Sequence, residues 1–532
     1  MKKILAFLMT LCMLTAVLCI TAVTVSAEGS ADPIVMRVTA TKKDGTVFTP
    51  EKSEFTSFSE GWVTAATYAK DSTWKNNNNI DRIIVDLLAD WTAANTSFGS
   101  GEGFSEGAIC IPKNTRFTLN MNGHTIDRDL NTWYYNGEVL YIREGADVII
   151  NGGKDGDEIV ALDKAPGTAP MGTITGGNSG NGAGGIHIDG KANVTLNNVH
   201  VVGNVADDDN GAGIAIHDNA TLNMNGGSIS NNISDGKSQD ADKFDGGGIY
   251  VYKANANFNN VEFKNNQNTK NSTNGTAIFA TGSEVTIEQC LFDGNGIHDS
   301  EKGTFYAISV IYGNDSNITV RNSTFTNNSS ARFTNHLYPL IEITVKEKYA
   351  SLFYLKNSTF TMENDCKITN NDVYDIFYLS GNVGFYVSDT TITDNTGVVL
   401  NTKSTTDDSY FKNCTFHNNI SPDPERYNHK KDFDFSIRDN ALTFYGCDLG
   451  DSIILDDNKR IVFADLEDFG DPDALNAGDS VASIFGEGSL MMILVTISLV
   501  TSSLSIFLTV YYNKKKTVPQ KATDGTATDT EE

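Results

Sequence analysis

The sequence predicts an all-β protein, a right-handed single-stranded parallel β-helix, on three observations. One seven-residue segment recurs along the middle of the chain, and each copy closes on asparagine. A short run of alternating apolar and polar residues, typical of a strand, precedes each copy. No amphipathic helix separates the copies, so each repeat must bury its strands against the next repeat. We expect right-handed winding because parallel crossovers almost always have that hand.

The first copy of the repeat is residues 198–204, Asn-Val-His-Val-Val-Gly-Asn. Further copies begin at Gly226, Asn260, Gln289, Asn322, Asp389 and Asn413, and a looser copy holds Phe360 and Asn364. The closing residues Asn204, Asn232, Asn266, Asn295 and Asn328 are separated by 28, 34, 29 and 33 residues, and Asn395 and Asn419 close the last two copies. These spacings indicate one coil length with added loops of variable length.

Equivalent positions of successive coils should stack about 4.8 Å apart. One inward row would be apolar and aromatic: Val201, Ile229, Phe263, Phe292, Phe325, Ile392 and Phe416. The position two residues earlier would hold small residues: Val199, Gly227, Val261, Cys290, Ser323, Thr390 and Cys414. We expect the closing asparagines to form a structural hydrogen-bonded ladder at the turn.

Both ends of the chain predict a membrane-associated protein. Residues 1–27 combine Lys2 and Lys3, an apolar run and a small-residue end, as in a secretory signal peptide. Residues 490–512 carry no formal charge and are long enough, at about 1.5 Å per residue, to cross a bilayer once. Three lysines follow this stretch, so the positive-inside rule places the tail in the cytoplasm and the bulk of the chain outside the cell membrane.

The predicted domain organisation follows from these features. It comprises a signal peptide at 1–27, an N-terminal cap at 28–105, the β-helix at 106–470, a juxtamembrane stalk at 471–489, a transmembrane helix at 490–512 and a cytoplasmic tail at 513–532. The cap holds a helical pattern at 60–70 and a strand pattern at 82–88. It would shield the first coil, whose open edge invites aggregation. We expect the four tryptophans to form the core of this region, with stacking on sugar rings as the alternative.

Composition and cysteine usage exclude several classes of protein. A formal net charge of -27 argues against nucleic-acid binding, which needs a basic surface. The five cysteines after the signal peptide show neither a paired framework nor metal-type spacing. Cys290, Cys414 and Cys447 are best interpreted as small buried fillers.

Two short motifs recur in the repeats and carry a resemblance to a known family. They are Gly-Gly-Ile at 184–186 and 247–249, and Phe-x-x-Asn ending at Asn266, Asn295, Asn328 and Asn419. They resemble the repeats of chlamydial polymorphic membrane proteins and of bacterial adhesin-like right-handed β-helix proteins, within a superfamily that includes pectate lyases. The similarity covers roughly residues 105–455. The single C-terminal helix, in place of an outer-membrane barrel, suggests a bacterium with one membrane.

The candidate chemical residues are acidic. Asp207, Asp208 and Asp209 are weak catalytic candidates, and Asp189, Asp207 and Asp209 are weak candidates for a Ca²⁺ site, with His187, His217 and Asp218 expected on neighbouring coils. No arginine occurs between Arg143 and Arg321, and the elements that mark polygalacturonases are absent. A solvated acidic turn is the simpler interpretation, and no other cofactor is indicated.

Two functions therefore stay open. The first is an adhesin-like surface protein that binds a polysaccharide, another glycan or a host protein. The alternative is a cell-surface polysaccharide lyase or glycoside hydrolase that acts on acidic polysaccharides. A basic residue facing the acidic cluster across one sheet would favour the enzyme, and a cluster scattered over several faces would favour the binding protein. A purely structural role in the envelope is a third interpretation.

Overall fold

The structure is a computed structural model and describes residues 32–93, 104–105, 108–153, 171–207, 209–236, 246–270, 274–296, 309–330, 350–402, 404–406, 408–420, 435–437, 441–450 and 461–469. The chain divides into two compact units, Met1–Val462 and Phe463–Glu532. The predicted signal peptide and the predicted transmembrane segment lie outside the described residues. Among the residues that are described, no helix combines the length and the apolar character needed to span a membrane.

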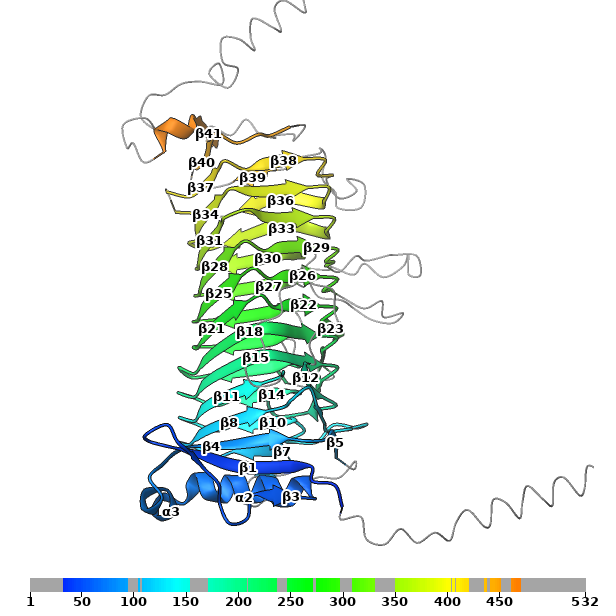
Figure 1. Cartoon of the computed structure of the whole chain (residues 1–532). Coiled ribbons are helices and arrows are strands. Elements are labelled where there is room, and N and C mark those ends of the chain that lie inside the picture. The colour runs from blue at the N-terminus through cyan, green and yellow to red at the C-terminus, as the bar shows by residue number, and fades with distance from the viewer. Residues whose placement is uncertain are drawn as a thin grey trace, which may run out of the picture. The chain divides into compact units, whose positions relative to one another are not determined.

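Stacked parallel strands build the first unit, and their arrangement fits a β-helix (Figure 1). The first stack contains β4 (Ile80–Leu87), β8 (Arg116–Asn120), β11 (Asp147–Asn151), β15 (Asn193–Val202), β18 (Thr221–Ser230), β21 (Asn255–Asn259), β25 (Glu284–Glu288), β28 (Asn317–Arg321), β31 (Thr359–Glu363), β34 (Gly384–Ser388), β37 (Tyr410–Lys412) and β40 (Leu442–Tyr445).

A second stack follows around the coil and shares the long strands β15 and β18. Its other members are β5 (Trp91–Thr92), β9 (Thr125–Asp127), β12 (Gly172–Thr175), β22 (Glu262–Lys264), β26 (Leu291–Asp293), β29 (Thr324–Thr326), β32 (Cys366–Thr369), β35 (Thr390–Thr393) and β38 (Thr415–His417).

A separate twelve-stranded sheet forms another face. It contains β6 (Phe104–Ser105), β7 (Ala108–Ile111), β10 (Leu140–Ile142), β14 (Ile186–Ile188), β17 (Ile214–His217), β20 (Ile249–Tyr252), β24 (Ile278–Thr281), β27 (Ser309–Asn314), β30 (Ser351–Lys356), β33 (Asp372–Ser380), β36 (Thr396–Thr402) and β39 (Phe435–Ile437). A short four-stranded sheet lies between the second stack and this face in chain order: β13 (Asn178–Ser179), β16 (Val205–Asp207), β19 (Ile233–Gly236) and β23 (Gln267–Lys270). The last described elements are β41 (Ile461–Ala464) and the 3₁₀ helix η2 (Leu466–Asp468).

An antiparallel segment with two helices lies at the N-terminal end of the stack (Figure 1). Strand β1 (Met36–Lys42) pairs antiparallel with β2 (Val47–Phe48), β3 (Glu54–Phe55) and β4. Helix α2 (Phe58–Lys70) begins at the capping residue Ser57 and is followed by α3 (Ser72–Asn77). Buried Trp62 of α2 donates its indole hydrogen to the Cys110 carbonyl of the first coil at 3.3 Å. The helix and strand patterns predicted at 60–70 and 82–88 correspond to α2 and β4.

Inward side chains of the second stack form the apolar row that the repeat predicts. Strand register pairs Val201 with Ile229, then Ile229 with Phe263, and continues through Phe292 and Phe325. The three phenylalanine rings stack with centroids 4.4 and 4.5 Å apart. All five side chains are fully buried, so this row is a continuous part of the core.

One copy of the repeat was misplaced by sequence. Phe360 pairs with Ile318 and Phe385 in the first stack, so it does not continue the row of Phe325. Ile368 pairs with Phe325 and with Ile392 and takes that place. The mistake arises because both stacks bury aromatic residues, so a phenylalanine alone does not identify the stack.

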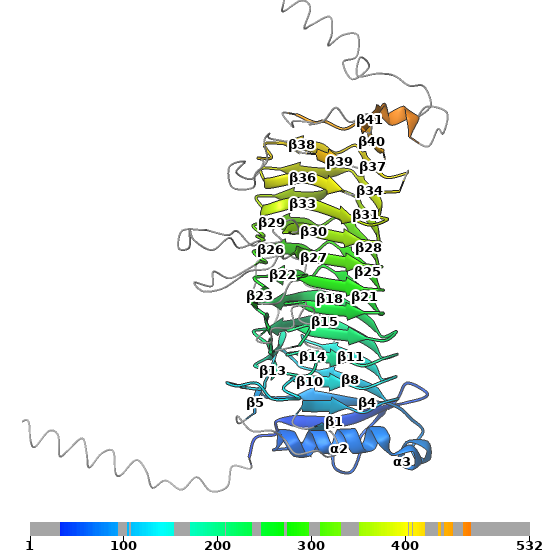
Figure 2. The ribbon, with the colours of Figure 1, turned by 180° about the vertical axis from the view of Figure 1, so that it is seen from behind.

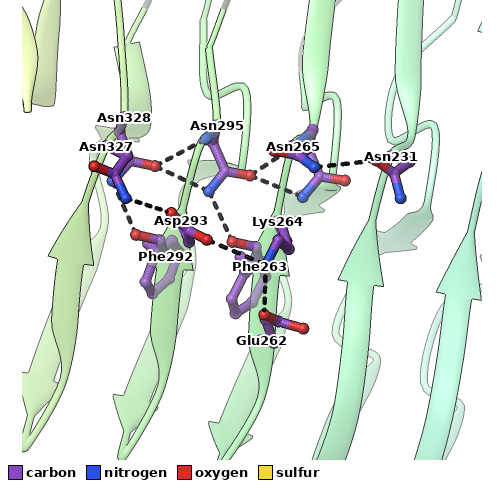
Figure 3. A network of polar contacts seen from close by, with 11 residues as sticks. Asn231, Glu262, Phe263, Lys264, Asn265, Phe292, Asp293, Asn295, Asn327 and Asn328 are labelled. Atoms are coloured by element: carbon purple, nitrogen blue, oxygen red, sulfur yellow. Dashed lines mark hydrogen bonds and ion pairs between the residues drawn. The ribbon is translucent and has the colours of Figure 1, made fainter. Parts of the chain in front are cut away.

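Figure 3 shows part of the asparagine ladder, with the Asn328 and Asn295 side chains along one edge of the stack. Asn266 is hydrogen-bonded to Asn295 and continues the ladder. Each amide nitrogen donates to the amide oxygen of the next coil, at 3.0 Å for Asn266 to Asn295 and 3.0 Å for Asn295 to Asn328. Each backbone nitrogen donates to the same oxygen. The connected residues are Asn204, Asn232, Asn266, Asn295, Asn328, Asn371, Asn395 and Asn419. Asn371 holds the place that the sequence interpretation gave to Asn364.

Candidate functional site

The four tryptophans have different environments in the structure. Trp62 is buried, Trp74 stacks on Tyr68 with ring centroids 4.4 Å apart, and Trp91 stacks on Phe58 at 4.1 Å. Trp133 lies outside the cap, on the connection between β9 and β10, and 55% of it is exposed. The cap-core prediction therefore describes Trp62. Trp74 and Trp91 are partly exposed, and Trp133 presents its ring to solvent.

The Trp133 connection is held against the turn of the next coil. The Tyr134 nitrogen donates to the Asn178 carbonyl at 3.0 Å, and the Gly180 nitrogen donates to the Tyr134 carbonyl at 2.9 Å. A Cβ atom at Gly180 would lie only 2.9 Å from the Trp133 ring, so glycine permits the indole to lie against this backbone. Tyr135, which is 61% exposed, is a second exposed aromatic residue on the same connection.

A buried arginine and a buried glutamate, Arg128 and Glu138, flank this connection. Arg128 is 0% and Glu138 is 1% exposed, and the Arg128 Nε donates to the Glu138 carbonyl at 3.4 Å. Burial raises the pKa of Glu138 to about 8 and lowers the pKa of Arg128 to about 10. Ser179 of β13 donates to the Glu138 carboxyl group at 3.4 Å and so joins the pair to the neighbouring coil. Neither Arg128 nor Glu138 belongs to a repeated motif, so no sequence pattern marks them as a buried pair.

Amide and carboxylate groups lie on the connection that carries Trp133 and on the turns of the neighbouring coils. The Asn181 amide donates to the Asn136 side-chain oxygen at 3.3 Å. The carboxylate of Asp209 accepts from the backbone nitrogens of Gly182 and Asn210. Burial raises the pKa of the Asp209 carboxyl group above its ordinary value. These groups offer both donors and acceptors beside Trp133.

A second part of the surface comes from the outward side of the twelve-stranded sheet. Tyr141, His187 and His217 of β10, β14 and β17 follow one another along the sheet, with ring centroids 4.8 and 5.1 Å apart and ring planes tilted by 37° and 49°. The Tyr141 hydroxyl donates to Asp189 at 2.7 Å, and the Arg143 guanidinium lies 5.6 Å from the Tyr141 ring. Figure 2 shows β10, β13 and β14 near the end of the stack that carries α2.

The two histidines are uncharged at neutral pH. Burial, with a contribution from His217, lowers the pKa of His187 to about 4, and burial also lowers the pKa of His217. Asp189 and Asp209 act in the opposite direction on His217. The charges of Asp189 and Asp209 therefore act on His217, although the three residues come from different coils.

The turn at 180–185 joins the two parts. Its Gly182 donates to Asp209, and a Cβ atom at Gly182 would approach the His187 Nδ1 to 2.3 Å. We call the resulting surface the Trp133 cluster and define it by Trp133, Tyr135, Asn136, Tyr141, Asn181, His187, Asp189, Asp209 and His217. The backbone at Gly182 has φ of +110°, which other residues rarely adopt, so this close passage depends on glycine.

The outward row of rings on the twelve-stranded sheet continues beyond the Trp133 cluster, but there the rings present their edges to solvent. Tyr250, Phe279, Tyr312 and Tyr354 stack face to face, with centroids 4.8 to 5.2 Å apart and planes within 19° of parallel. Each face is covered by a neighbour, so a flat ligand cannot stack on it. Trp133 therefore offers a more accessible ring face than this row.

The structure brings together some of the predicted acidic residues. Asp189 and Asp209 belong to the Trp133 cluster, together with His187 and His217. Asp207 is in β16, is only 5% exposed and pairs in register with Asp235. Asp208 lies outside the described residues, and Asp218 lies in an exposed turn. Within the described ranges, no group of three or more His, Cys, Asp or Glu side chains is arranged to hold a metal ion.

Comparison with known proteins gives no match to a family model, to a curated protein or to a solved structure. The chemical capacity of the Trp133 cluster therefore has to be derived from its own side chains. Exposed rings can stack on the apolar face of a sugar, and amides and carboxylates can bind hydroxyl groups.

Proposed function

We propose that the protein is an adhesin-like β-helix, right-handed and anchored in the cell membrane by residues 490–512, that binds a glycan chain at the Trp133 cluster. One observation carries the choice of site: Trp133 and Tyr135 are 55% and 61% exposed beside hydrogen-bonding groups. A solvent-exposed indole gains contact area when it stacks on a sugar ring, at little cost in side-chain entropy.

The polar groups of the Trp133 cluster orient the bound glycan through hydrogen bonds. The Asn136 and Asn181 amides can exchange hydrogen bonds with hydroxyl groups next to the ring that stacks on Trp133. Tyr141, bonded to Asp189, extends the polar surface across the neighbouring coil. A glycan with several linked sugars would contact both parts at once, which favours a chain over a single monosaccharide.

The second candidate is a polysaccharide lyase or glycoside hydrolase at the same surface. It is favoured by Arg143, which lies near Tyr141 and Asp189 and supplies the basic group that the acidic cluster needs. It is disfavoured by the position of Asp207, which lies in β16 of the four-stranded sheet, whereas Asp189 directly follows β14 of the twelve-stranded sheet. We therefore rank binding above cleavage.

A panel of neutral and acidic polysaccharides tests the proposal with the full-length chain in detergent. Retention of the protein on each polysaccharide measures binding, while new reducing ends or unsaturated uronate absorbance measures cleavage, each with and without a chelator. We expect saturable binding without cleavage, and a loss of at least tenfold in affinity for Trp133→Ala. A matched control is Phe469→Ala, which removes an exposed ring from the second compact unit and should leave binding unchanged.

Two results would contradict this ranking. Cleavage that disappears in Asp189→Asn would identify an enzyme. Equal binding by the wild type and by Trp133→Ala would remove the Trp133 cluster as the glycan site.

A further inference from the structure

Four cysteines occupy a single inward row of the β-helix, where the chain passes from the first stack to the second. Strand register and side-chain contacts give the order Cys290, Ser323, Cys366, Thr390, Cys414 and Cys447. A hydroxyl-bearing residue separates Cys290 from Cys366 and Cys366 from Cys414. Within the described part of the chain, Cys414 and Cys447 are the cysteines that stand on adjacent coils without such a spacer.

Backbone pairing on both sides fixes these two residues opposite each other. Before them, Lys412 pairs with Tyr445, and after them Thr415 pairs with Asp448. The Asp448 nitrogen also donates to the Cys414 carbonyl at 2.8 Å. Neighbouring strands lie about 4.8 Å apart, which is within the Cα separation that a disulfide spans. The Cys414 nitrogen already contacts the Cys447 sulfur at 3.4 Å.

We propose that Cys414 and Cys447 form a disulfide bond that fastens the last part of the stack to the coil before it. The bond would close a segment of 33 residues. It adds a covalent modification site to a chain whose cysteine spacing shows no paired framework. The proposal does not depend on glycan binding.

The two thiols differ in exposure and in pKa, and this difference determines which of them reacts first with an oxidant. Cys447 is partly exposed, and the pKa of its thiol is lowered because the Cys414 side chain hydrogen-bonds to it. Cys414 is 1% exposed, and burial raises the pKa of its thiol. The Cys447 thiolate therefore attacks the oxidant first, because the thiolate is the nucleophile and needs access.

The step balances with a disulfide as the oxidant, either glutathione disulfide or the disulfide of an oxidoreductase. Cys447 forms a mixed disulfide and releases one thiolate from the oxidant. Cys414 then loses its proton and attacks the Cys447 sulfur, which releases the second thiolate. The two cysteines lose two electrons and two protons in total, and the oxidant becomes two thiols.

Peptide mapping of the full-length chain tests the proposal. The protein is equilibrated with glutathione disulfide, unfolded, alkylated and digested without reductant. We expect a cross-linked peptide pair that contains Cys414 and Cys447, and alkylated Cys110, Cys290 and Cys366. Free alkylated Cys414 and Cys447, a persistent glutathione adduct or a different pairing would overturn the proposal.

Thermal unfolding gives a second readout that does not depend on mapping. Dithiothreitol should lower the melting temperature of the oxidised wild type by several degrees and should have no effect on Cys447→Ser. Cys290→Ser is the matched control because it changes the same row, where Ser323 already shows that serine fits, and it should keep the response to reductant. An equal response in Cys447→Ser would contradict the proposed disulfide.

Discussion

Asparagine performs two different tasks at each turn between the second stack and the next sheet. The ladder residues, such as Asn295, are fully buried and hydrogen-bonded along the stack. The residue before each ladder position has a positive φ, for example 55° at Asn327 and 68° at Gly294. Such backbone angles favour glycine, asparagine and aspartate. The same rule explains the residues that open the repeat, including Asn198, Gly226 and Asn322.

Removing a ladder side chain should cost stability because it leaves buried groups without partners. For Asn295→Ala, the Asn266 amide and backbone nitrogens lose their acceptor, so we expect a loss of about 1–3 kcal/mol in the free energy of unfolding. Denaturant titration measures this change. Asn257→Ala removes an exposed amide that also bonds to its neighbour, and it should cost under about 0.5 kcal/mol. Equal losses in both variants would show that the ladder contributes little.

His187 of the Trp133 cluster predicts a pH dependence of the free energy of unfolding. The pKa of His187 falls from 6.5 to about 4 on folding, so the unfolded chain binds the proton more tightly. Its contribution to stability is present above pH 6.5 and is lost as the pH falls towards 4, by at most about 3 kcal/mol and less because the ring is partly exposed. His187→Gln should flatten this part of the curve of unfolding free energy against pH. An unchanged slope in that variant would contradict the assigned pKa.

Sequence reasoning at this scale succeeded where residues repeat. The ladder positions could be predicted because the same asparagine returns once per coil. The Arg128 and Glu138 pair could not, since each residue occurs once and its burial depends on how the loops fold together. Trp133 was grouped with the other tryptophans for a similar reason, because exposure is a property of the folded loop.

The inward and outward aromatic rows show how stacked elements gain stability. Phe292 lies between two rings of the core and is fully buried, whereas Tyr312 lies in the outward row and is partly exposed. The inward row therefore contributes burial in addition to ring stacking.

Truncation of these two rings should separate the contributions. We expect Phe292→Ala to lower the free energy of unfolding by about 3–5 kcal/mol and Tyr312→Ala by about 1–2 kcal/mol. Chemical denaturation followed by far-ultraviolet circular dichroism measures both. A larger loss in Tyr312→Ala would mean that the outward row is the main stabilising element.

The misplaced copy of the repeat shows that motif spacing alone does not always identify the strand to which a residue belongs. Phe360 and Asn364 imitate the spacing of the motif, but the structure uses Ile368 and Asn371. The register of a strand is fixed by its pairing with the strand of the preceding coil. The sequence of one coil alone therefore does not identify which of its residues align with that coil. The correct copy could have been recognised from Ile368-Thr369-Asn370-Asn371, whose pattern matches Ile392-Thr393-Asp394-Asn395.

At the scale of the molecule, repetition predicts the stacked strands and irregularity locates the candidate site. Successive turns differ little along the asparagine ladder, and Figure 3 shows how regular their polar contacts are. Trp133, Tyr135, Asn136 and Asn181 of the Trp133 cluster lie where the turns depart from that regularity, in the connections at 128–139 and 180–185. Ligand-binding residues are commonly placed on such connections because a rigid scaffold holds them.

Fluorescence quenching of tryptophan by acrylamide tests the central claim most directly. Trp133 is the described tryptophan with the most accessible ring, so it should account for most of the quenching, and Trp133→Phe should reduce it strongly. When a polysaccharide identified by the binding panel saturates the full-length chain, we predict that the quenching falls towards the level of that variant. If the bound polysaccharide leaves the quenching of Trp133 unchanged, the glycan does not bind at the Trp133 cluster and the proposed function is wrong.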